Sequence, residues 1–136
     1  MFLLDTNIVS ELRRAKPHGG VLAWFDALRP DEIQIPAAVI AEISRGIELL
    51  RTSNARKATE LSTWLDALER DFAVLPVTSP IFRIWGQLMH RRQAHLTIDA
   101  LIAATALYHG LTVATRNVED FTPFGVLVAN PFGRAR

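Results

Sequence analysis

The chain has 136 residues, of which 49% are hydrophobic, so it can form one domain with a substantial core. Its 15 basic and 14 acidic residues nearly balance, and net charge therefore gives no reason to expect nucleic-acid or membrane binding. The chain has no cysteine, no secretory signal pattern and no apolar run of about 20 residues, which excludes a disulfide framework and predicts a cytoplasmic protein without a membrane span.

Short apolar runs alternate with segments of helical periodicity along the chain. The runs that predict strands are residues 2–4, 33–35, 73–77, 111–114 and 126–128. Strands that alternate with helices favour an α/β fold whose mostly parallel sheet is covered on both faces. Ligands of such sheets gather at the carboxyl ends of the strands, where Asp5 and residues 115–117 are expected.

Three helices are predicted in the middle of the chain. The first covers 36–50 and would begin with Pro36, which suits a first helical position. The second covers 54–72, with Asn54 as its cap. The third covers 80–95. These helices are expected to be amphipathic, with one face toward the sheet.

The last third of the chain predicts one more long helix and a tail. Thr97 is the expected cap of this helix, which places Asp99 in the first turn. Proline and glycine follow Asn130, so we expect residues 131–136 to form a flexible tail. The whole chain, residues 1–136, is expected to be a single domain.

Three carboxylates occupy positions where an ionised side chain is unfavourable. Asp5 closes the apolar run at the start of the chain, Glu42 lies within a helical apolar stripe, and Asp99 opens an almost wholly apolar helix. Burying an ionised carboxylate without a partner is costly. The three residues together favour a cation site, since Mg²⁺ and Mn²⁺ prefer oxygen ligands.

Each carboxylate also has a structural interpretation, which the sequence leaves open. Asp5 would cap the following helix, Asp99 would interact with its own helix dipole, and Glu42 would pair with an arginine. Other chemistries find less support. The four histidines lack zinc-ligand spacing, and the chain has no phosphate-binding loop, dinucleotide fingerprint or serine-hydrolase elbow.

Three segments carry a family resemblance that extends over essentially the whole chain. They are FLLDTNIVSEL (2–12), IPAAVIAEISRGIELL (35–50) and TIDALIAATALYHGLTVATRNVEDF (97–121). In this order they resemble a PIN-domain ribonuclease of the VapC/FitB type, the toxin of a bacterial toxin–antitoxin pair. The resemblance implies a three-layer α/β/α sandwich with a central parallel sheet, and an acidic pocket that binds Mg²⁺ or Mn²⁺.

By position, Asp5, Glu42 and Asp99 match the three main acids of that family and are the expected catalytic and metal-binding residues. Such proteins often have a fourth acid after the strand that ends in T-x, but this chain has Asn117 there and Asp120 three residues later. Asn117 can offer an amide oxygen to a metal ion or its water, and Asp120 is the alternative ligand. The sequence does not decide between them.

The resemblance also implies residues around the acids. Thr6 and Asn7 beside Asp5, and Thr115 beside Asn117, are expected to orient ligands and waters by hydrogen bonds. Basic side chains are expected to hold the RNA backbone. They are Arg13, Arg14, Arg45 and Arg116.

The implied activity is that of a type II toxin, an endoribonuclease that hydrolyses RNA with metal-activated water. The implied partners are a cognate VapB/FitA-like antitoxin whose C-terminal segment covers the acidic pocket, a second copy of the chain, and operator DNA in a heterotetramer or hetero-octamer. Two other classes stay open: a non-catalytic PIN-like module that binds a partner's basic tail, and a phosphotransfer domain with a phosphorylated aspartate. Metal-dependent cleavage would distinguish the enzyme from the first. The second has less support, because no aspartate lies two residues after Asp5 and the chain has only two lysines, Lys16 and Lys57.

Overall fold

The computed structural model describes residues 1–134. In this part of the chain, five parallel strands form one sheet with the order β3-β2-β1-β4-β5. The strands are β1 (Phe2–Leu4), β2 (Ile33–Pro36), β3 (Ala73–Leu75), β4 (Thr112–Ala114) and β5 (Val128–Ala129). Because β1 is the central strand, the residue that follows it lies in the middle of the carboxyl edge of the sheet.

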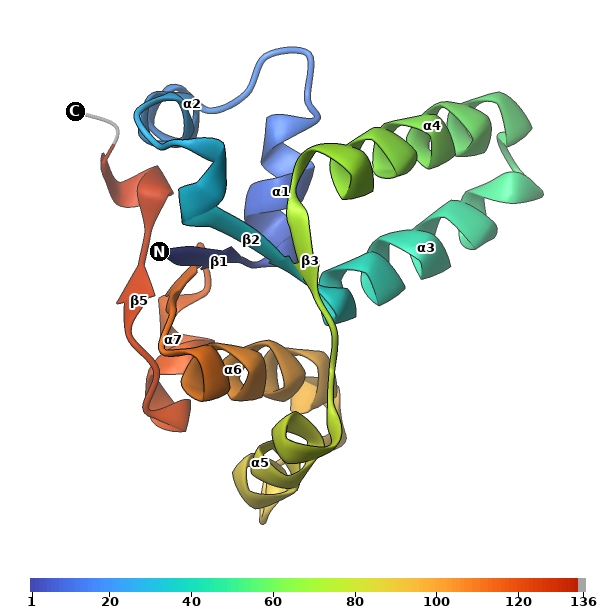
Figure 1. Cartoon of the computed structure of the whole chain (residues 1–136). Coiled ribbons are helices and arrows are strands. Elements are labelled where there is room, and N and C mark those ends of the chain that lie inside the picture. The colour runs from blue at the N-terminus through green and yellow to red at the C-terminus, as the bar shows by residue number, and fades with distance from the viewer. Residues whose placement is uncertain (135–136) are drawn as a thin grey trace.

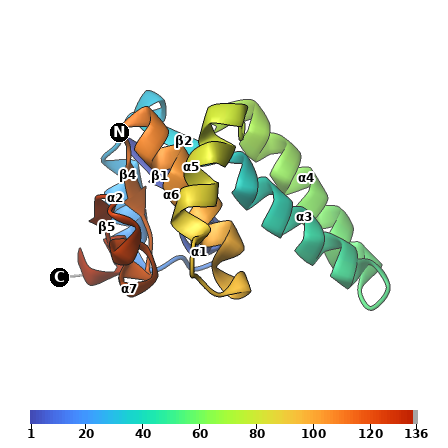
Figure 2. The same cartoon turned by 90° about the horizontal axis from the view of Figure 1, so that it is seen from below.

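Helices cover both faces of this sheet. Within residues 1–134 the α-helices are α1 (Thr6–Leu12), α2 (Gly19–Asp26), α3 (Ala37–Arg51), α4 (Ala55–Asp71), α5 (Ser79–Met89), α6 (Thr97–His109) and α7 (Val118–Phe121). Figure 1 shows α1 and α2 on one side of the sheet and α5 and α6 on the other. In the view from below, α5 and α6 pack side by side (Figure 2). The predicted α/β/α sandwich is confirmed.

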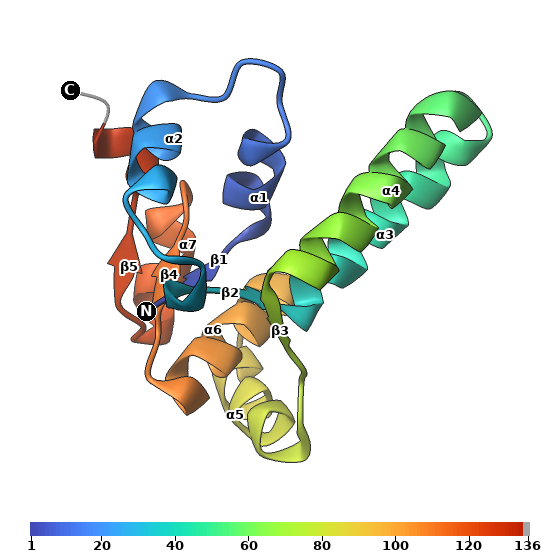
Figure 3. The same cartoon turned by 45° about the horizontal axis from the view of Figure 1, so that its top comes forward.

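α3 and α4 form a hairpin that extends away from the sheet (Figure 3). Ile47, Ala58 and Leu65 are buried between the two helices and form an apolar cluster of their own. Another face of α3 borders an open groove beside α1. Glu42 lies on that open face.

The main core lies between the sheet and the helices that cover it. Leu3 and Val113 are fully buried in neighbouring strands, and Ala100 and Ala103 are fully buried on α6. α6 ends at Gly110, whose φ of +68° is a left-handed conformation that glycine adopts without strain. Despite its apolar character α6 has only 13 residues, and no helix within residues 1–134 is long and apolar enough to cross a membrane.

Two helix boundaries differ from the sequence prediction. The helix expected over 80–95 is α5, and it ends at Met89 because Arg91 has a φ of +61°, which an α-helix cannot contain. Thr97 is the first residue of α6 instead of its cap. Its hydroxyl donates to the carbonyl of Ala94 at 2.6 Å, and so joins α6 to the preceding 3₁₀ turn.

Other boundaries lie close to the predicted ones. Pro36 is the last residue of β2 and the cap of α3, so the helix begins at Ala37, one position after the expected first residue. Asn54 caps α4 as predicted, since its side chain accepts from the Lys57 amide at 3.1 Å. The fifth strand begins later than expected, at Val128, because the chain first turns at Gly125 with a φ of +80°.

The segment after Asn130 is more ordered than predicted. Pro131–Arg134 is a 3₁₀ helix, η4, in which Pro131 is buried and Phe132 packs against the main core. The prediction of a flexible tail is therefore wrong for residues 131–134. Residues 135–136 of the predicted tail lie outside the described residues.

Candidate active site

Asp5 is a buried carboxylate at the carboxyl end of the central strand, with 3% of its surface exposed. It caps α1, because Oδ1 accepts from the Thr6 amide at 2.7 Å. Oδ2 accepts from the Asn7 side-chain amide at 2.9 Å and from the Thr115 hydroxyl at 2.7 Å. The capping interpretation is thus correct, and it leaves one acceptor site on Oδ1 for another group.

The neighbouring strand supplies the partners of Asp5. β1 and β4 are parallel with Leu4 opposite Ala114, so the next residues in each chain segment, Asp5 and Thr115, lie together. Thr115 is fully buried and its hydroxyl oxygen accepts from the Asn117 amide at 2.9 Å. The structure therefore places Thr6 and Asn7 beside Asp5, as expected, and Thr115 beside both Asn117, where it was expected, and Asp5.

Glu42 reaches the site from the side of α3. The sequence predicted a core-facing position for it, and this is wrong: the residue is exposed, and the buried side chains of α3 are instead Ala38 and Val39 in the main core and Ile47 against α4. Its carboxylate accepts a hydrogen bond from the Thr6 hydroxyl. Thr6 therefore contacts Glu42 through its side chain and Asp5 through its backbone amide.

Asp99 is half-buried in the first turn of α6. Burial and, to a smaller extent, the negative charges of Asp5, Asp120 and Glu42 together raise the pKa of Asp99 to about 7. The pKa of Asp5 is also raised, first by burial and then by Glu42, although its hydrogen bonds act in the opposite direction. These carboxylates, from four separate elements, consequently lie close enough to oppose one another's ionisation.

The two candidates for the fourth position occupy the same small pocket. Arg116, Asn117, Asp120 and Asn130 line it, and its volume is about 330 Å³. Of the two candidates only Asp120 carries a charge, and it is the one that raises the pKa of Asp99.

A divalent cation fits the chemistry of this cluster. Its donors are carboxylate oxygens with amide and hydroxyl groups around them, which are the ligands that Mg²⁺ and Mn²⁺ prefer. A cation would offset the repulsion that raises the pKa of Asp99. Within residues 1–134, no three acidic or histidine side chains are drawn together as tightly as a bound ion requires. Asp5 and Glu42 are instead hydrogen-bonded to their neighbours.

The PIN domain family matches residues 2–122 of the chain. The chain belongs to this family. The toxin FitB of Neisseria gonorrhoeae is 37% identical, over 97% of this PIN domain and 99% of FitB. A VapC ribonuclease of Sinorhizobium fredii, Y4jK, is 32% identical over 97% and 98% of the two chains.

A solved structure agrees with the sequence comparison. The crystal structure of FitAcB from Neisseria gonorrhoeae contains a chain that superimposes on this PIN domain with a TM-score of 0.85 and 36% identity. The match covers 97% of this chain and 99% of the other. The family resemblance predicted from the sequence is therefore confirmed.

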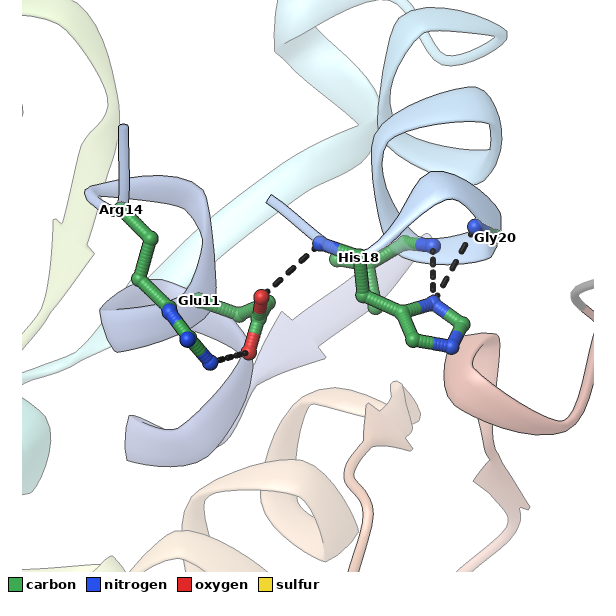
Figure 4. Close-up of polar contacts among 5 residues, drawn as sticks. Glu11, Arg14, His18 and Gly20 are labelled. Carbon is green, nitrogen blue, oxygen red and sulfur yellow. Dashed lines mark hydrogen bonds and ion pairs between the residues drawn. The ribbon is translucent and has the colours of Figure 1, made fainter. Parts of the chain in front are cut away.

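The four arginines expected at the site of this PIN domain are not equivalent. Arg13 lines a groove that also contains Thr6 and Glu42, and Arg45 lines a neighbouring pocket on the other side of Glu42. Arg116 lines the pocket that contains Asp120. Arg14 instead pairs with Glu11 at 3.4 Å, so its side chain is engaged away from the acidic cluster (Figure 4).

Sequence reasoning did not identify a second buried carboxylate, Glu11. Its Oε2 accepts from the His18 backbone amide at 2.8 Å (Figure 4). The His18 ring in turn accepts from the amides of Gly20 and Val21 and so caps α2. These contacts join the end of α1 to the start of α2. A glutamate seven residues before a histidine has no recognised spacing, so the sequence contained no signal for this pair.

Proposed function

We propose that this chain is the toxin of a type II toxin–antitoxin pair and an Mg²⁺- or Mn²⁺-dependent endoribonuclease that acts in the cytoplasm. One arrangement supports it most strongly: Thr6 joins Asp5 and Glu42 by hydrogen bonds, and the charges of both, with that of Asp120, act on the half-buried Asp99. Four carboxylates from separate elements, at the carboxyl edge of a parallel sheet, form an arrangement whose charge a divalent ion would balance.

Asp5, Glu42 and Asp99 would hold the metal, and Asp120 is the fourth ligand in preference to Asn117. A bound divalent ion supplies a nucleophilic water at neutral pH and offsets charge on the leaving 3′ oxygen of the phosphodiester. The products of this reaction carry 5′ phosphates.

The surrounding side chains would keep these carboxylates in position. The Thr115 hydroxyl and the Asn7 amide hold Oδ2 of Asp5, and the Thr6 amide holds Oδ1. The Thr6 hydroxyl orients Glu42 from the other side. Hydrogen bonds of this kind fix the direction of a ligand's lone pairs and reduce the reorganisation that metal binding requires.

An antitoxin is the proposed protein partner. A groove of about 210 Å³ between α1, α3 and α4 begins at Thr6 and Glu42, and apolar side chains continue it. They are Ile43, Ile47, Leu50, Leu61 and Trp64. The C-terminal segment of an antitoxin would occupy this groove and place an arginine against Asp5, Glu42 and Asp99, where a guanidinium substitutes for the cation.

We further propose the assembly that the resemblance implies, a homodimer that joins its antitoxin in a heterotetramer or hetero-octamer on operator DNA. A chain 34% identical to this one occurs in the structure of FitAB bound to an IR36 DNA fragment, with a TM-score of 0.84. Size-exclusion chromatography with light scattering on the co-expressed pair measures the stoichiometry.

The proposed activity is tested by incubating the purified chain with single-stranded and structured RNA in Mg²⁺ or Mn²⁺, with and without chelator. Cleavage only with metal, and products that a 5′-phosphate-dependent exonuclease degrades, are the expected results. A chain that leaves RNA intact under all these conditions but still binds the antitoxin would be a non-catalytic PIN-like module.

A further inference from the structure

We propose that Phe132 is a positioning residue that holds the Arg116 guanidinium at the edge of the acidic site, and that Arg116 there binds a phosphate of the RNA beside the one that is cleaved. The inference rests on the proposed ribonuclease function and adds a phosphate-binding subsite to it. The inference is based on contacts of the C-terminal helix η4. Catalysis by the carboxylates does not require these contacts.

The first observation is a cation–π contact. The guanidinium carbon of Arg116 lies 4.6 Å from the centroid of the Phe132 ring. A guanidinium stacked in this way uses its face, while its N–H groups lie in the plane and stay available as donors. Such a group can therefore be held by an aromatic ring and still bind the oxygens of a phosphate.

The second observation is that Arg116 belongs to the site through its backbone. Its amide donates to the side chain of Asn7 at 3.1 Å, and Asn7 donates to Asp5 at 2.9 Å. Its side chain lines the pocket of about 330 Å³ that also contains Asp120. Among residues 1–134, no carboxylate forms an ion pair with the Arg116 guanidinium.

The third observation is that the Phe132 ring is itself fixed. It packs against the main core, and its amide donates to the Asn130 side chain at 3.0 Å. The His18 ring contacts it with centroids 5.0 Å apart. His18 is held in turn by Glu11 and by the first amides of α2 (Figure 4). Figure 1 shows the C-terminal segment beside α2, so α1, α2 and η4 together position one arginine.

A phosphate is the ligand that this arrangement fits. Arg116 presents a charged donor edge at the rim of a site that would hold a phosphodiester, and the carboxylates of the same pocket would repel the next phosphate unless a cation stood between them. An arginine that is fixed in advance loses less side-chain entropy when it binds that phosphate.

The test measures binding and cleavage of one probe, a fluorescein-labelled single-stranded RNA of mixed sequence. Binding is followed by anisotropy in Ca²⁺, and KM and kcat for cleavage are measured in Mn²⁺. We expect Arg116→Ala to weaken binding at least about tenfold and to reduce the salt dependence of binding by about one phosphate contact. Phe132→Leu should raise KM and Kd about two- to fivefold with little change in kcat. Phe132→Tyr, which keeps the ring, should restore both.

Two controls separate positioning from a structural role. Arg29→Ala removes an exposed arginine before β2, at the opposite edge of the sheet, and should leave Kd and KM unchanged. In Arg116→Ala the further change Phe132→Leu should have no additional effect on Kd, because the ring then has no guanidinium to hold. Additive effects of the two changes would overturn the inference.

The outcomes also distinguish this inference from the proposed function. If wild type cleaves the RNA and Phe132→Leu binds and cleaves like wild type, the positioning role is wrong and the ribonuclease stands. If wild type binds the RNA, cuts nothing, and loses affinity in Phe132→Leu, the subsite stands and the nuclease is wrong. An RNA that is neither bound nor cut contradicts both.

Discussion

The two edges of the central sheet differ in what their pockets contain. Beside the amino end of β1 lies a pocket of about 430 Å³ lined by apolar residues, among them Phe2, Trp24 and Leu28. At the carboxyl edge the pocket beside Asp120 is smaller, about 330 Å³, yet its wall contains two carboxylates, Glu119 and Asp120. The larger pocket has no ionisable side chain in its wall. The volume of a pocket is therefore a poor indicator of the functional site here, and the presence of carboxylates with raised pKa values is a better indicator.

The two edges of the sheet also differ in how they affect the stability of the fold. The amino edge stabilises the fold through apolar contact, such as the edge-to-face pair of Phe2 and Trp24 at 5.0 Å. Above about pH 7 the carboxyl edge destabilises the metal-free fold, because burial raises the pKa values of Asp5 and Asp99 and both must then carry charge. Functional residues can thus be recognised as those whose ionisation the fold opposes.

The largest expected effect is on catalysis at the carboxyl edge. Asp5→Asn, Glu42→Gln and Asp99→Asn should each lower kcat/KM for RNA cleavage at least about 100-fold, since each removes a charged ligand. Ala27→Leu, which fills the amino-edge pocket, should leave cleavage unchanged. Circular dichroism checks that each variant is folded. Equal losses at both edges would mean that the carboxylates act only through the fold.

A somewhat smaller effect is expected when a partner of Asp5 is removed. Thr115→Val keeps the shape of a buried side chain but removes the 2.7 Å hydrogen bond to Oδ2. Metal affinity should fall about 10- to 100-fold, as is typical when a group that orients a ligand is lost. Thr115→Ser should restore most of it. Calorimetric titration with Mn²⁺ measures both, and unchanged affinity in Thr115→Val would remove this residue from the site.

Stability should change in the direction opposite to activity. The folded-state pKa of Asp99 is raised from 3.8 to about 7, so its contribution to stability is complete below about pH 4 and is lost as the pH rises through 7. In chelator at about pH 8, Asp99→Asn should therefore raise the free energy of unfolding by about 1–2 kcal/mol, a figure reduced for solvent screening. Asp66→Asn, an exposed change on α4, should have no effect. Urea unfolding at about pH 4 and at about pH 8 provides the test. If Asp99→Asn were less stable than wild type at about pH 8, the prediction would be contradicted.

The smallest effect concerns the fourth ligand. Asp120→Asn should weaken Mn²⁺ binding severalfold, because this exposed carboxylate contributes charge near Asp99. Asn117→Asp should tighten it by a similar factor if the side chain reaches the same ion. The reverse ranking, with Asp120→Asn neutral and Asn117→Ala strongly weakened, would assign the position to Asn117.

The sequence predicted the parts of the site that depend on strand ends. A parallel sheet brings residues that follow adjacent strands together, and this places Thr115 on Asp5. It did not predict that Glu42 is exposed, because the apolar stripe of α3 could face either the sheet or another helix. In the structure the stripe packs against α4, and this tertiary contact cannot be deduced from the periodicity of the sequence.

Contacts between distant segments could not be predicted from the sequence either, because they also depend on tertiary packing. Arg116 and Phe132 are separated by α7, a 3₁₀ turn and β5, and neither belongs to a periodic pattern. The prediction of a flexible tail was based on proline and glycine content. It was wrong for residues 131–134 because a single aromatic side chain, Phe132, packs against the core.

Calorimetric titration of the metal-free protein with Mn²⁺ at about pH 8 and about pH 6 tests most directly whether the acidic cluster is a metal centre. Because Asp99 must ionise to bind the ion and its pKa is raised to about 7, affinity should be about tenfold weaker at the lower pH. In Asp99→Asn binding should be much weaker at both pH values and should lose this pH dependence, while Asp66→Asn should bind like wild type. Mn²⁺ affinity that is the same at both pH values, and the same in Asp99→Asn as in wild type, would contradict the assignment of these carboxylates as the metal site.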